Sequence, residues 1–122
     1  LTSRQVTDVV DYTYSYDSGG NIDLITNNLE VANSLTLTYD LKHRLTDVTK
    51  NLTNSQFTYD ETDNRVSKQV DGELDNYSYE NTKLTTLNSE TLTYDNNGNL
   101  AQKGSDLFTY NLANRYWHKY ND

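Results

Sequence analysis

The chain contains no cysteine, proline or methionine among its 122 residues. Without cysteine no disulfide can stabilise the fold, and the redox compartment stays undetermined. No stretch approaches the roughly 18 to 20 consecutive apolar residues of a membrane span, and no basic-then-apolar signal segment opens the sequence. The 10 basic residues are scattered among 18 acidic ones, and this net charge of −8 argues against a nucleic-acid-binding surface.

Six copies of one short phrase are what the sequence does contain. Each phrase opens with an anchor tyrosine followed by Asp, Glu or Asn, continues through a polar cluster and closes on an apolar or aromatic residue. The anchors are Tyr16, Tyr39, Tyr59, Tyr79, Tyr94 and Tyr110. The residue two before each anchor is apolar or aromatic, and the residue between is Ser or Thr, which is the period-two alternation of a half-buried strand. Each copy therefore predicts a hairpin.

Turn chemistry supports the same interpretation. An Asp at the first turn position can accept backbone N–H groups, and Gly, Asn or His later in the turn tolerates a left-handed backbone. The predicted first positions are Asp17, Asp40, Asp60, Asp95 and Asn111, and the predicted left-handed positions are Gly20, His43, Asn64, Gly98 and Asn114. The unit at Tyr59 is expected to carry one extra residue and the unit at Tyr79 one fewer. Three arginines, Arg44, Arg65 and Arg115, are expected at matching positions after their turns.

Further turn signals separate the units, at Asn27-Asn28, residues 51–54, Asp71-Gly72, Asn88-Ser89 and Gly104-Ser105. Turns at both ends of every strand predict an all-β fold, a repetitive antiparallel hairpin meander of roughly ten to twelve strands. We treat residues 1–122 as a single array of about six hairpin units. Because only one face is apolar, the sheet must be curled on itself, pack against a second sheet or belong to a longer array, and we expect it to be a piece of a longer array.

Candidate catalytic and metal-binding groups are confined to the acidic turns. Two recurring Asp residues could form a glycosidase pair, but equivalent surroundings would not separate their pKa values, so turn capping is favoured. The oxygen-rich turns at residues 60–64 and 95–99 lack the terminal Glu and fixed Gly of an EF-hand loop. No Cys, and no Ser with a visible base, supplies a nucleophile. We therefore assign no catalytic, cofactor-binding or metal-binding residue and predict that the chain is not an enzyme.

The tyrosines give the main alternative function. A row of tyrosines could hold sugar rings or a polypeptide, whereas the structural interpretation is that they stack across strands and hold the sheet together. The candidate face comprises Tyr14, Tyr16, Tyr39, Tyr59, Tyr77, Tyr79, Tyr94 and Tyr110. We favour the structural interpretation.

The repeated phrase resembles the YD repeat of Rhs proteins, toxin-complex shell components and teneurins. The match is fullest at residues 94–100 and close at residues 16–22, 39–45 and 110–116. The resemblance implies a spiral strip of hairpins forming a hollow shell, which in bacterial members encloses a toxic C-terminal domain. Such shells also contain a self-cleaving segment with a Pro-containing motif, and this proline-free chain has no counterpart of it.

The expected function is therefore a non-catalytic structural module of a secreted or cell-surface toxin-delivery protein, without a cofactor. Its expected partners are neighbouring repeats of the same polypeptide or an enclosed toxin domain, with no nucleic acid and no membrane insertion. The alternative is a carbohydrate- or protein-binding adhesin module, whose partner would be a glycan or a cell-surface protein. Open strand edges add edge-to-edge self-association as a further expectation.

Overall fold

The computed structural model describes residues 10–113 and 115–120. The chain divides into two compact units, Leu1–Phe57 and Thr58–Asp122. Apart from one short 3-10 helix, the regular elements in the described part of the chain are β-strands. Strand order follows the chain within each unit, and the strand pairings are antiparallel. The predicted all-β hairpin meander is confirmed.

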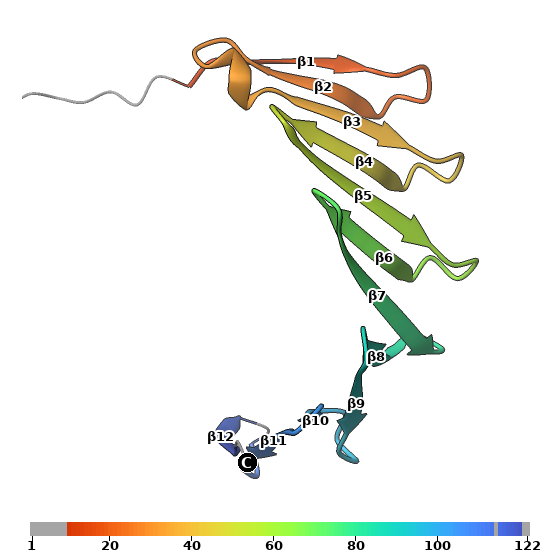
Figure 1. The fold of residues 1–122 in the computed structure, drawn as a ribbon, viewed down its shortest axis with the longest axis vertical. Helices are drawn as coiled ribbons and strands as arrows, with labels where there is room; N and C mark the ends of the chain where they lie inside the picture. The colour runs from red at the N-terminus through yellow and green to blue at the C-terminus, as the bar shows by residue number, and fades with distance from the viewer. Residues whose placement is uncertain (1–9, 114, 121–122) are drawn as a thin grey trace, which may run out of the picture. The chain divides into compact units, whose positions relative to one another are not determined.

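The first unit contains four complete strands and most of a fifth (Figure 1). Its elements are β1 (Tyr12–Tyr16), β2 (Ile22–Asn27), the 3-10 helix η1 (Val31–Asn33), β3 (Leu35–Tyr39), β4 (Leu45–Lys50) and β5 (Thr53–Tyr59). Strand β5 runs across the boundary into the second unit. No helix among the described residues is long and apolar enough to cross a bilayer.

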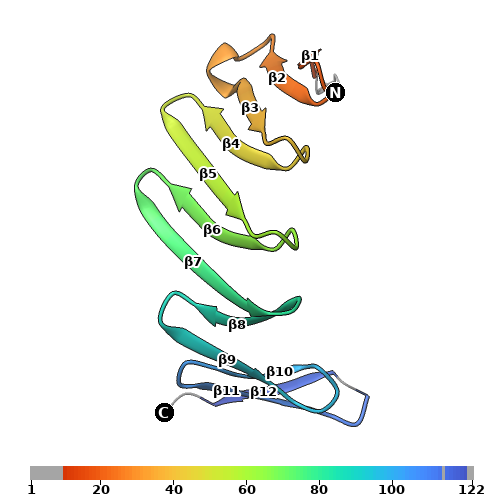
Figure 2. The same ribbon diagram turned by 90° about the vertical axis from the view of Figure 1, so that its right-hand side faces the viewer.

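The second unit continues the same alternation of strands and tight turns (Figure 2). Its strands are β6 (Arg65–Val70), β7 (Glu73–Glu80), β8 (Lys83–Leu87), β9 (Glu90–Tyr94), β10 (Leu100–Lys103), β11 (Asp106–Tyr110) and β12 (Tyr116–Tyr120). Strands of four to eight residues are the length that the spacing of the anchors allows.

Alternate residues of a strand differ in burial. In β3 the side chains of Leu35, Leu37 and Tyr39 are partly buried, while Thr36 and Thr38 are exposed. We call these the apolar face and the hydroxyl face of the sheet. Leu92, at 9% exposure, is the one buried residue in the described part of the chain, and no side chain there is fully buried. The units are therefore thin sheets, in which each strand gains most of its contacts from its two neighbours.

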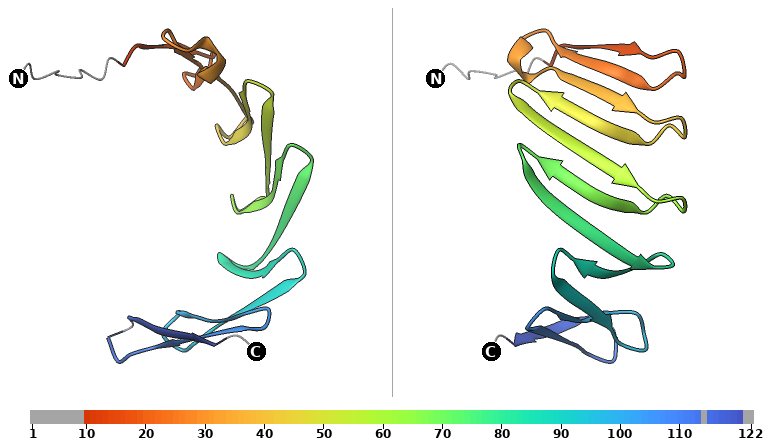
Figure 3. Two further views of the ribbon diagram at one scale, coloured as in Figure 1. Left: turned by 60° about the vertical axis from the view of Figure 1, so that its left-hand side comes forward. Right: turned by 45° about the vertical axis from the view of Figure 1, so that its right-hand side comes forward.

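The two kinds of turn lie at opposite ends of the strands within each unit (Figure 3). The short turn between β6 and β7 has positive φ at both Asp71 (49°) and Gly72 (93°), which is the backbone of a type I′ hairpin turn. Asn51 and Asn88, each with φ 53°, begin the corresponding turns between β4 and β5 and between β8 and β9. The turn predicted over residues 51–54 is shorter, because Thr53 already belongs to β5.

Candidate functional site: aspartate turns and anchor tyrosines

One carboxylate organises each long turn, as the hairpin of β1 and β2 shows. The backbone N–H of Asp17 donates to the Asn21 carbonyl at 2.8 Å, and the N–H of Gly20 donates to the Asp17 carbonyl at 3.1 Å. The Asp17 carboxylate accepts the N–H of Gly19 at 2.8 Å, the N–H of Asn21 at 2.9 Å and the side-chain amide of Asn21 at 2.8 Å. Three donors thus converge on one side chain and fix the path of the turn.

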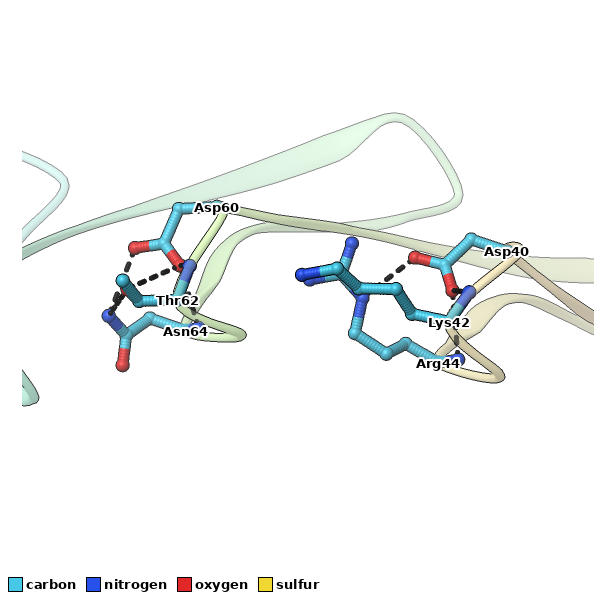
Figure 4. Close-up of polar contacts among 6 residues, drawn as sticks. All are labelled: Asp40, Lys42, Arg44, Asp60, Thr62 and Asn64. Atoms are coloured by element: carbon cyan, nitrogen blue, oxygen red, sulfur yellow. Dashed lines mark hydrogen bonds and ion pairs between the residues drawn. The ribbon is translucent and has the colours of Figure 1, made fainter.

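The same arrangement recurs in the next hairpins (Figure 4). Asp40 accepts the N–H groups of Lys42 and Arg44 at 2.9 and 3.0 Å, and the guanidinium Nε of Arg44 at 2.7 Å. Asp60 accepts from Thr62 and Asn64 in the equivalent positions, each contact at 2.9 Å. An amide or a guanidinium therefore serves equally well as the fifth residue of the turn.

Two later turns complete the series. Asp95 accepts the N–H groups of Asn97 and Asn99 at 2.9 Å and the Asn99 side-chain amide at 3.0 Å. Asn111 replaces the aspartate in the hairpin of β11 and β12, and its side-chain oxygen accepts the N–H groups of Ala113 and Arg115 at 3.0 Å. The turn needs an acceptor oxygen at its first residue, and a negative charge is optional.

Hydrogen bonding lowers the pKa of all four aspartates. For Asp17, Asp60 and Asp95 the leading cause is the side-chain amide four residues later, and their turn N–H groups act in the same direction. For Asp40 the leading cause is the backbone N–H of Arg44. Donors that bind the ionised form favour it, so these carboxylates stay charged to more acid pH than free aspartate.

The left-handed position of the turns is Gly20 (φ 86°), His43 (φ 61°) and Gly98 (φ 83°), where the sequence placed it. The prediction of Asn64 is wrong, because Asp63 (φ 69°) takes this conformation. The remaining predicted position, Asn114, lies outside the described residues.

The extra residue predicted for the Tyr59 unit is also wrong. Asn64 is the fifth residue of its turn, since the N–H of Asp60 donates to the Asn64 carbonyl at 2.9 Å. Arg65 therefore begins strand β6 and does not match Arg44, which closes its own turn. The shorter turn after Tyr79 differs as expected, with only two residues between Glu80 and its partner Lys83.

Sequence reasoning missed a β-bulge beside five of the anchor tyrosines. Tyr39 lies opposite Leu45, but the preceding residue Thr38 lies opposite Asp47, so Thr46 is the extra residue of the return strand. Equivalent shifts occur beside Tyr16, Tyr79, Tyr94 and Tyr110. A bulge bends the strand and increases its twist. The repeated sequence distance between an anchor and the residue opposite it, shared by the hairpins of Tyr16, Tyr39, Tyr94 and Tyr110, was the available signal.

A second missed feature is a hydrogen bond from the anchor hydroxyl to the preceding hairpin. The Tyr39 hydroxyl donates to the Ile22 carbonyl at 2.9 Å. The hydroxyls of Tyr79 and Tyr94 donate to the carbonyls of Arg65 and Leu84 at 3.0 and 2.8 Å. Ile22 and Arg65 are the first residues of their return strands, and Leu84 is the second residue of its own.

This bond closes a gap in the sheet. The register between β2 and β3 contains only Leu24 opposite Thr36 and Ile25 opposite Leu35, and it does not extend to Ile22. Neighbouring hairpins thus pair through their backbones away from the aspartate turns and through a tyrosine hydroxyl near them.

The register shows which residues lie opposite the anchor tyrosines within their own hairpins. Tyr16, Tyr39, Tyr79 and Tyr94 lie opposite Ile22, Leu45, Leu84 and Leu100, and Tyr110 lies opposite Tyr116. Two rings instead receive cations: the Arg65 guanidinium lies 4.9 Å from the Tyr77 ring centre, and the Lys83 ammonium lies 4.5 Å from that of Tyr94. Within these hairpins, the residue directly opposite an anchor tyrosine is therefore mostly aliphatic.

Adjacent aspartate turns also touch each other. In the first unit His43 Nδ1 lies 3.0 Å from Asn21 Oδ1, and Gly19 leaves the space that the His43 ring occupies. In the second unit the side-chain amide of Asn64 donates to the Asn81 carbonyl at 3.0 Å. The turns therefore form a continuous polar rim within each pair of hairpins.

The chemistry of this arrangement is architectural. The acceptor oxygens of the turn aspartates are already engaged by the donors of their own turns, as the distances above show. Within residues 10–113 and 115–120, no group of three or more His, Asp or Glu side chains is placed to hold a metal ion.

A hollow of about 500 Å³ on the apolar face of the first unit, which we call the edge groove, is lined by Tyr12, Tyr14, Ile25, Asn27, Glu30, Asn33, Leu35 and Lys50.

Comparison with known proteins assigns the chain to a family. The profile of the teneurin YD-shell matches residues 3–122. Two curated relatives are 32% identical across 97% of this chain: the "tRNA nuclease WapA" of Bacillus subtilis strain 168 and the "tRNA3(Ser)-specific nuclease WapA" of Bacillus spizizenii. A third, the "tRNA(Glu)-specific nuclease WapA" of Bacillus subtilis subsp. natto, is 36% identical over 69% of the chain. The chain spans 5% of the length of the first two relatives. It belongs to the teneurin YD-shell family.

Proposed function

We propose that this chain is a wall segment of a β-shell in a secreted or surface toxin-delivery protein, whose shell encloses a C-terminal toxin. The observation that carries the proposal is the hairpin-to-hairpin connection. Three anchor tyrosines donate a hydroxyl hydrogen bond to a backbone carbonyl of the preceding hairpin. These bonds join one hairpin to the next. A module built to continue from one hairpin to the next is suited to forming wall.

The relatives and the engaged turn aspartates agree with this role. The family is named for its shell, and the relatives that match are named as tRNA nucleases. In this chain the recurring aspartates are occupied as turn caps, so we assign the toxic activity to a different part of the parent protein. Neighbouring repeats of the same polypeptide are the proposed partners of the module.

A glycan-binding adhesin is the alternative function. It would need tyrosine hydroxyls available to sugar, and those of Tyr39, Tyr79 and Tyr94 are bound to backbone carbonyls. A glycan array separates the two functions. Specific sugar binding that is lost on Tyr→Ala changes of the exposed tyrosines would favour the adhesin.

A chimera tests the wall role directly. The 127-residue segment of Bacillus subtilis WapA that aligns with this chain would be replaced by the chain itself. We expect the nuclease of the chimera to resist added protease as it does in the unmodified protein. A second chimera, with alanine at Asp17, Asp40, Asp60 and Asp95, should lose this resistance, and one with Glu73→Ala should keep it. If the nuclease is digested equally in all three chimeras, the wall proposal fails.

A further inference from the structure

One aspartate turn combines an asparagine at its third position with a glycine at its fourth. Asn97 and Gly98 hold these positions in the turn between β9 and β10, and both residues are exposed. No other asparagine of the chain is followed by glycine. The glycine serves the turn, because its φ of 83° lies in the left-handed region that favours glycine. The turn thus places a glycine directly after an exposed side-chain amide.

This dipeptide can modify itself covalently. The backbone nitrogen of Gly98, once hydroxide has removed its proton, can attack the side-chain carbonyl carbon of Asn97. The new C–N bond closes a succinimide ring, and the side-chain amide nitrogen leaves as ammonia. Water then opens the ring at either carbonyl carbon and leaves an aspartate or an isoaspartate. Glycine does not hinder the ring closure, and no atom lies within 4 Å of the place that a Cβ of Gly98 would occupy.

The closed turn holds the attacking nitrogen away from this reaction. The N–H of Gly98 donates to the Asp95 carbonyl at 3.0 Å, and the N–H of Asn97 donates to the Asp95 carboxylate at 2.9 Å. Ring closure requires the Gly98 nitrogen to lose its proton and to turn toward the Asn97 side chain, and both changes break its hydrogen bond to Asp95. The turn must therefore open locally before the ring can form.

An isoaspartate adds a methylene group to the backbone of the turn. The extra carbon lies between the Cα of Asn97 and the nitrogen of Gly98, inside the loop that the Asp95 N–H closes on the Asn99 carbonyl at 2.9 Å. Asn99 also supplies two donors to the Asp95 carboxylate, its N–H at 2.9 Å and its side-chain amide at 3.0 Å. The lengthened backbone displaces Asn99 from these positions.

We propose that Asn97-Gly98 is a self-modification site that reacts when the Asp95 turn opens, and that its isoaspartate product prevents the turn from closing again. A brief opening is reversible, because the side-chain amide is still intact. An opening that lasts long enough for ring closure becomes permanent. The aspartate product keeps the ordinary backbone length, so it allows the turn to close with one added negative charge. The site concerns the hairpin of β9 and β10 and stands independently of the shell role.

Mass spectrometry of the 122-residue chain measures the reaction. The chain is incubated at mildly alkaline pH, with and without urea, and the tryptic peptide between Lys83 and Lys103 is sequenced at intervals. We expect Asn97 to exchange its amide for a carboxyl group roughly tenfold more slowly in the native chain than in urea, since opening costs about one hydrogen bond. Asn88 is an internal control in the same peptide, because its side chain is hydrogen-bonded to β7. Asn97→Gln should remove the reaction.

Variants show whether the turn itself sets the rate. Asp95→Ala removes the cap of this turn and should bring the native rate at Asn97 close to the rate in urea. Asp60→Ala removes the equivalent carboxylate from another turn of the second unit and should leave the rate at Asn97 unchanged. Asp95→Asn keeps an acceptor oxygen, as Asn111 does in its own turn, and should retain most of the protection.

The isoaspartate product is tested on the incubated chain. Chains with isoaspartate at residue 97 should have a lower urea midpoint than fresh chain, whereas Asn97→Asp, which adds the charge without the methylene group, should keep the midpoint. Equal midpoints of the isoaspartate form and Asn97→Asp would overturn the proposal. So would a reaction at Asn97 that is as fast in the native chain as in urea, or an equal acceleration by Asp60→Ala and Asp95→Ala.

Discussion

At the scale of single residues, the first turn position does most to define the hairpin. Each turn carboxylate accepts two backbone N–H groups and one side-chain donor. The side-chain donor is an amide at Asp60 and Asp95 and a guanidinium at Asp40. Buried or semi-buried N–H groups that lose an acceptor are costly, because they cannot return to water while the turn is intact. The aspartates are therefore equivalent structural parts.

This equivalence predicts the behaviour of alanine variants. Asp40→Ala, Asp60→Ala and Asp95→Ala should each lower the urea midpoint of unfolding, and by similar amounts. Glu73→Ala, at an exposed carboxylate in β7, should leave the midpoint nearly unchanged. One aspartate whose replacement is silent while the others are harmful would contradict the shared capping role.

The anchor hydroxyl can be tested separately from the ring. Tyr79→Phe removes the donor to the Arg65 carbonyl and keeps the ring. We expect a loss of about 0.5–1.5 kcal/mol in the free energy of unfolding, the usual net value of a hydrogen bond. Tyr14→Phe is the matched control, because Tyr14 is 53% exposed and its hydroxyl has no partner among the described residues. Equal stability of the two variants would show that the hydroxyl bond contributes nothing.

At the scale of the element, the hairpin combines three devices: an aspartate turn, a bulge beside the anchor and a short turn at the other end. The bulge separates the return strand from the next hairpin near the aspartate turn, and the anchor hydroxyl spans the separation. The short turns bring the backbones together again at the far end. This alternation explains why a sheet with so few buried residues keeps a defined register.

The turn between β6 and β7 depends on glycine. Gly72 has φ 93°, and its position is open to a Cβ, so the cost of substitution comes from the backbone conformation and not from a clash. Gly72→Ala should destabilise the second unit by roughly 1–2 kcal/mol, the cost of a left-handed conformation. Gly72→Asn should cost less, since Asn tolerates this region. Chemical denaturation followed by tryptophan fluorescence measures the free energy of unfolding of both variants. If Gly72→Ala left this free energy unchanged, the turn would have changed its type.

At the scale of the whole molecule, the free energy of folding comes from many small local interactions in place of one large hydrophobic core. Leu92 is the sole buried residue among those described, and no side chain there is fully buried. Hydrogen bonds to charged turn residues therefore carry an unusual share of the stability. Such a protein should respond strongly to conditions that neutralise carboxylates.

Acid should unfold the chain progressively. Asp17, Asp40, Asp60 and Asp95 have folded pKa values below the ordinary 3.8, as has Asp47, mainly through the side-chain amide of Gln56. A carboxyl with a lowered folded pKa stabilises the fold fully above its unfolded pKa, and this contribution is lost as the pH falls through the folded pKa. The urea midpoint should thus be level near neutrality and fall below about pH 4. A midpoint that stays level down to about pH 2 would contradict this.

Replacing the turn aspartates by asparagine separates the acid sensitivity caused by their protonation from that caused by the protonation of other carboxylates. Asn111 shows that an amide oxygen can occupy the first turn position. A variant with asparagine at Asp17, Asp40, Asp60 and Asp95 should therefore keep the fold at neutral pH and show a flatter decline in acid. An unchanged acid profile would assign the pH dependence to other groups.

The sequence alone determined the hairpins, their order, the aspartate or asparagine at the first position of five turns and the glycine or histidine at three left-handed positions. It could do so because these features depend on contacts within about five residues, where side-chain type and backbone conformation are directly linked. It failed at Asn64, because Asp and Asn are both tolerated at positive φ and only the closing hydrogen bond to Asp60 shows which residue ends the turn.

Only the tertiary structure decided the bulges and the destination of the tyrosine hydroxyls. The Tyr39 hydroxyl and the Ile22 carbonyl lie 17 residues apart, so their meeting depends on the register between hairpins. That register depends on the bulge and on the point where the backbone pairing between hairpins ends. The repeated sequence motif predicts neither of them. The repeat thus specifies each hairpin through local chemistry, whereas the way hairpins join depends on pairing between distant strands.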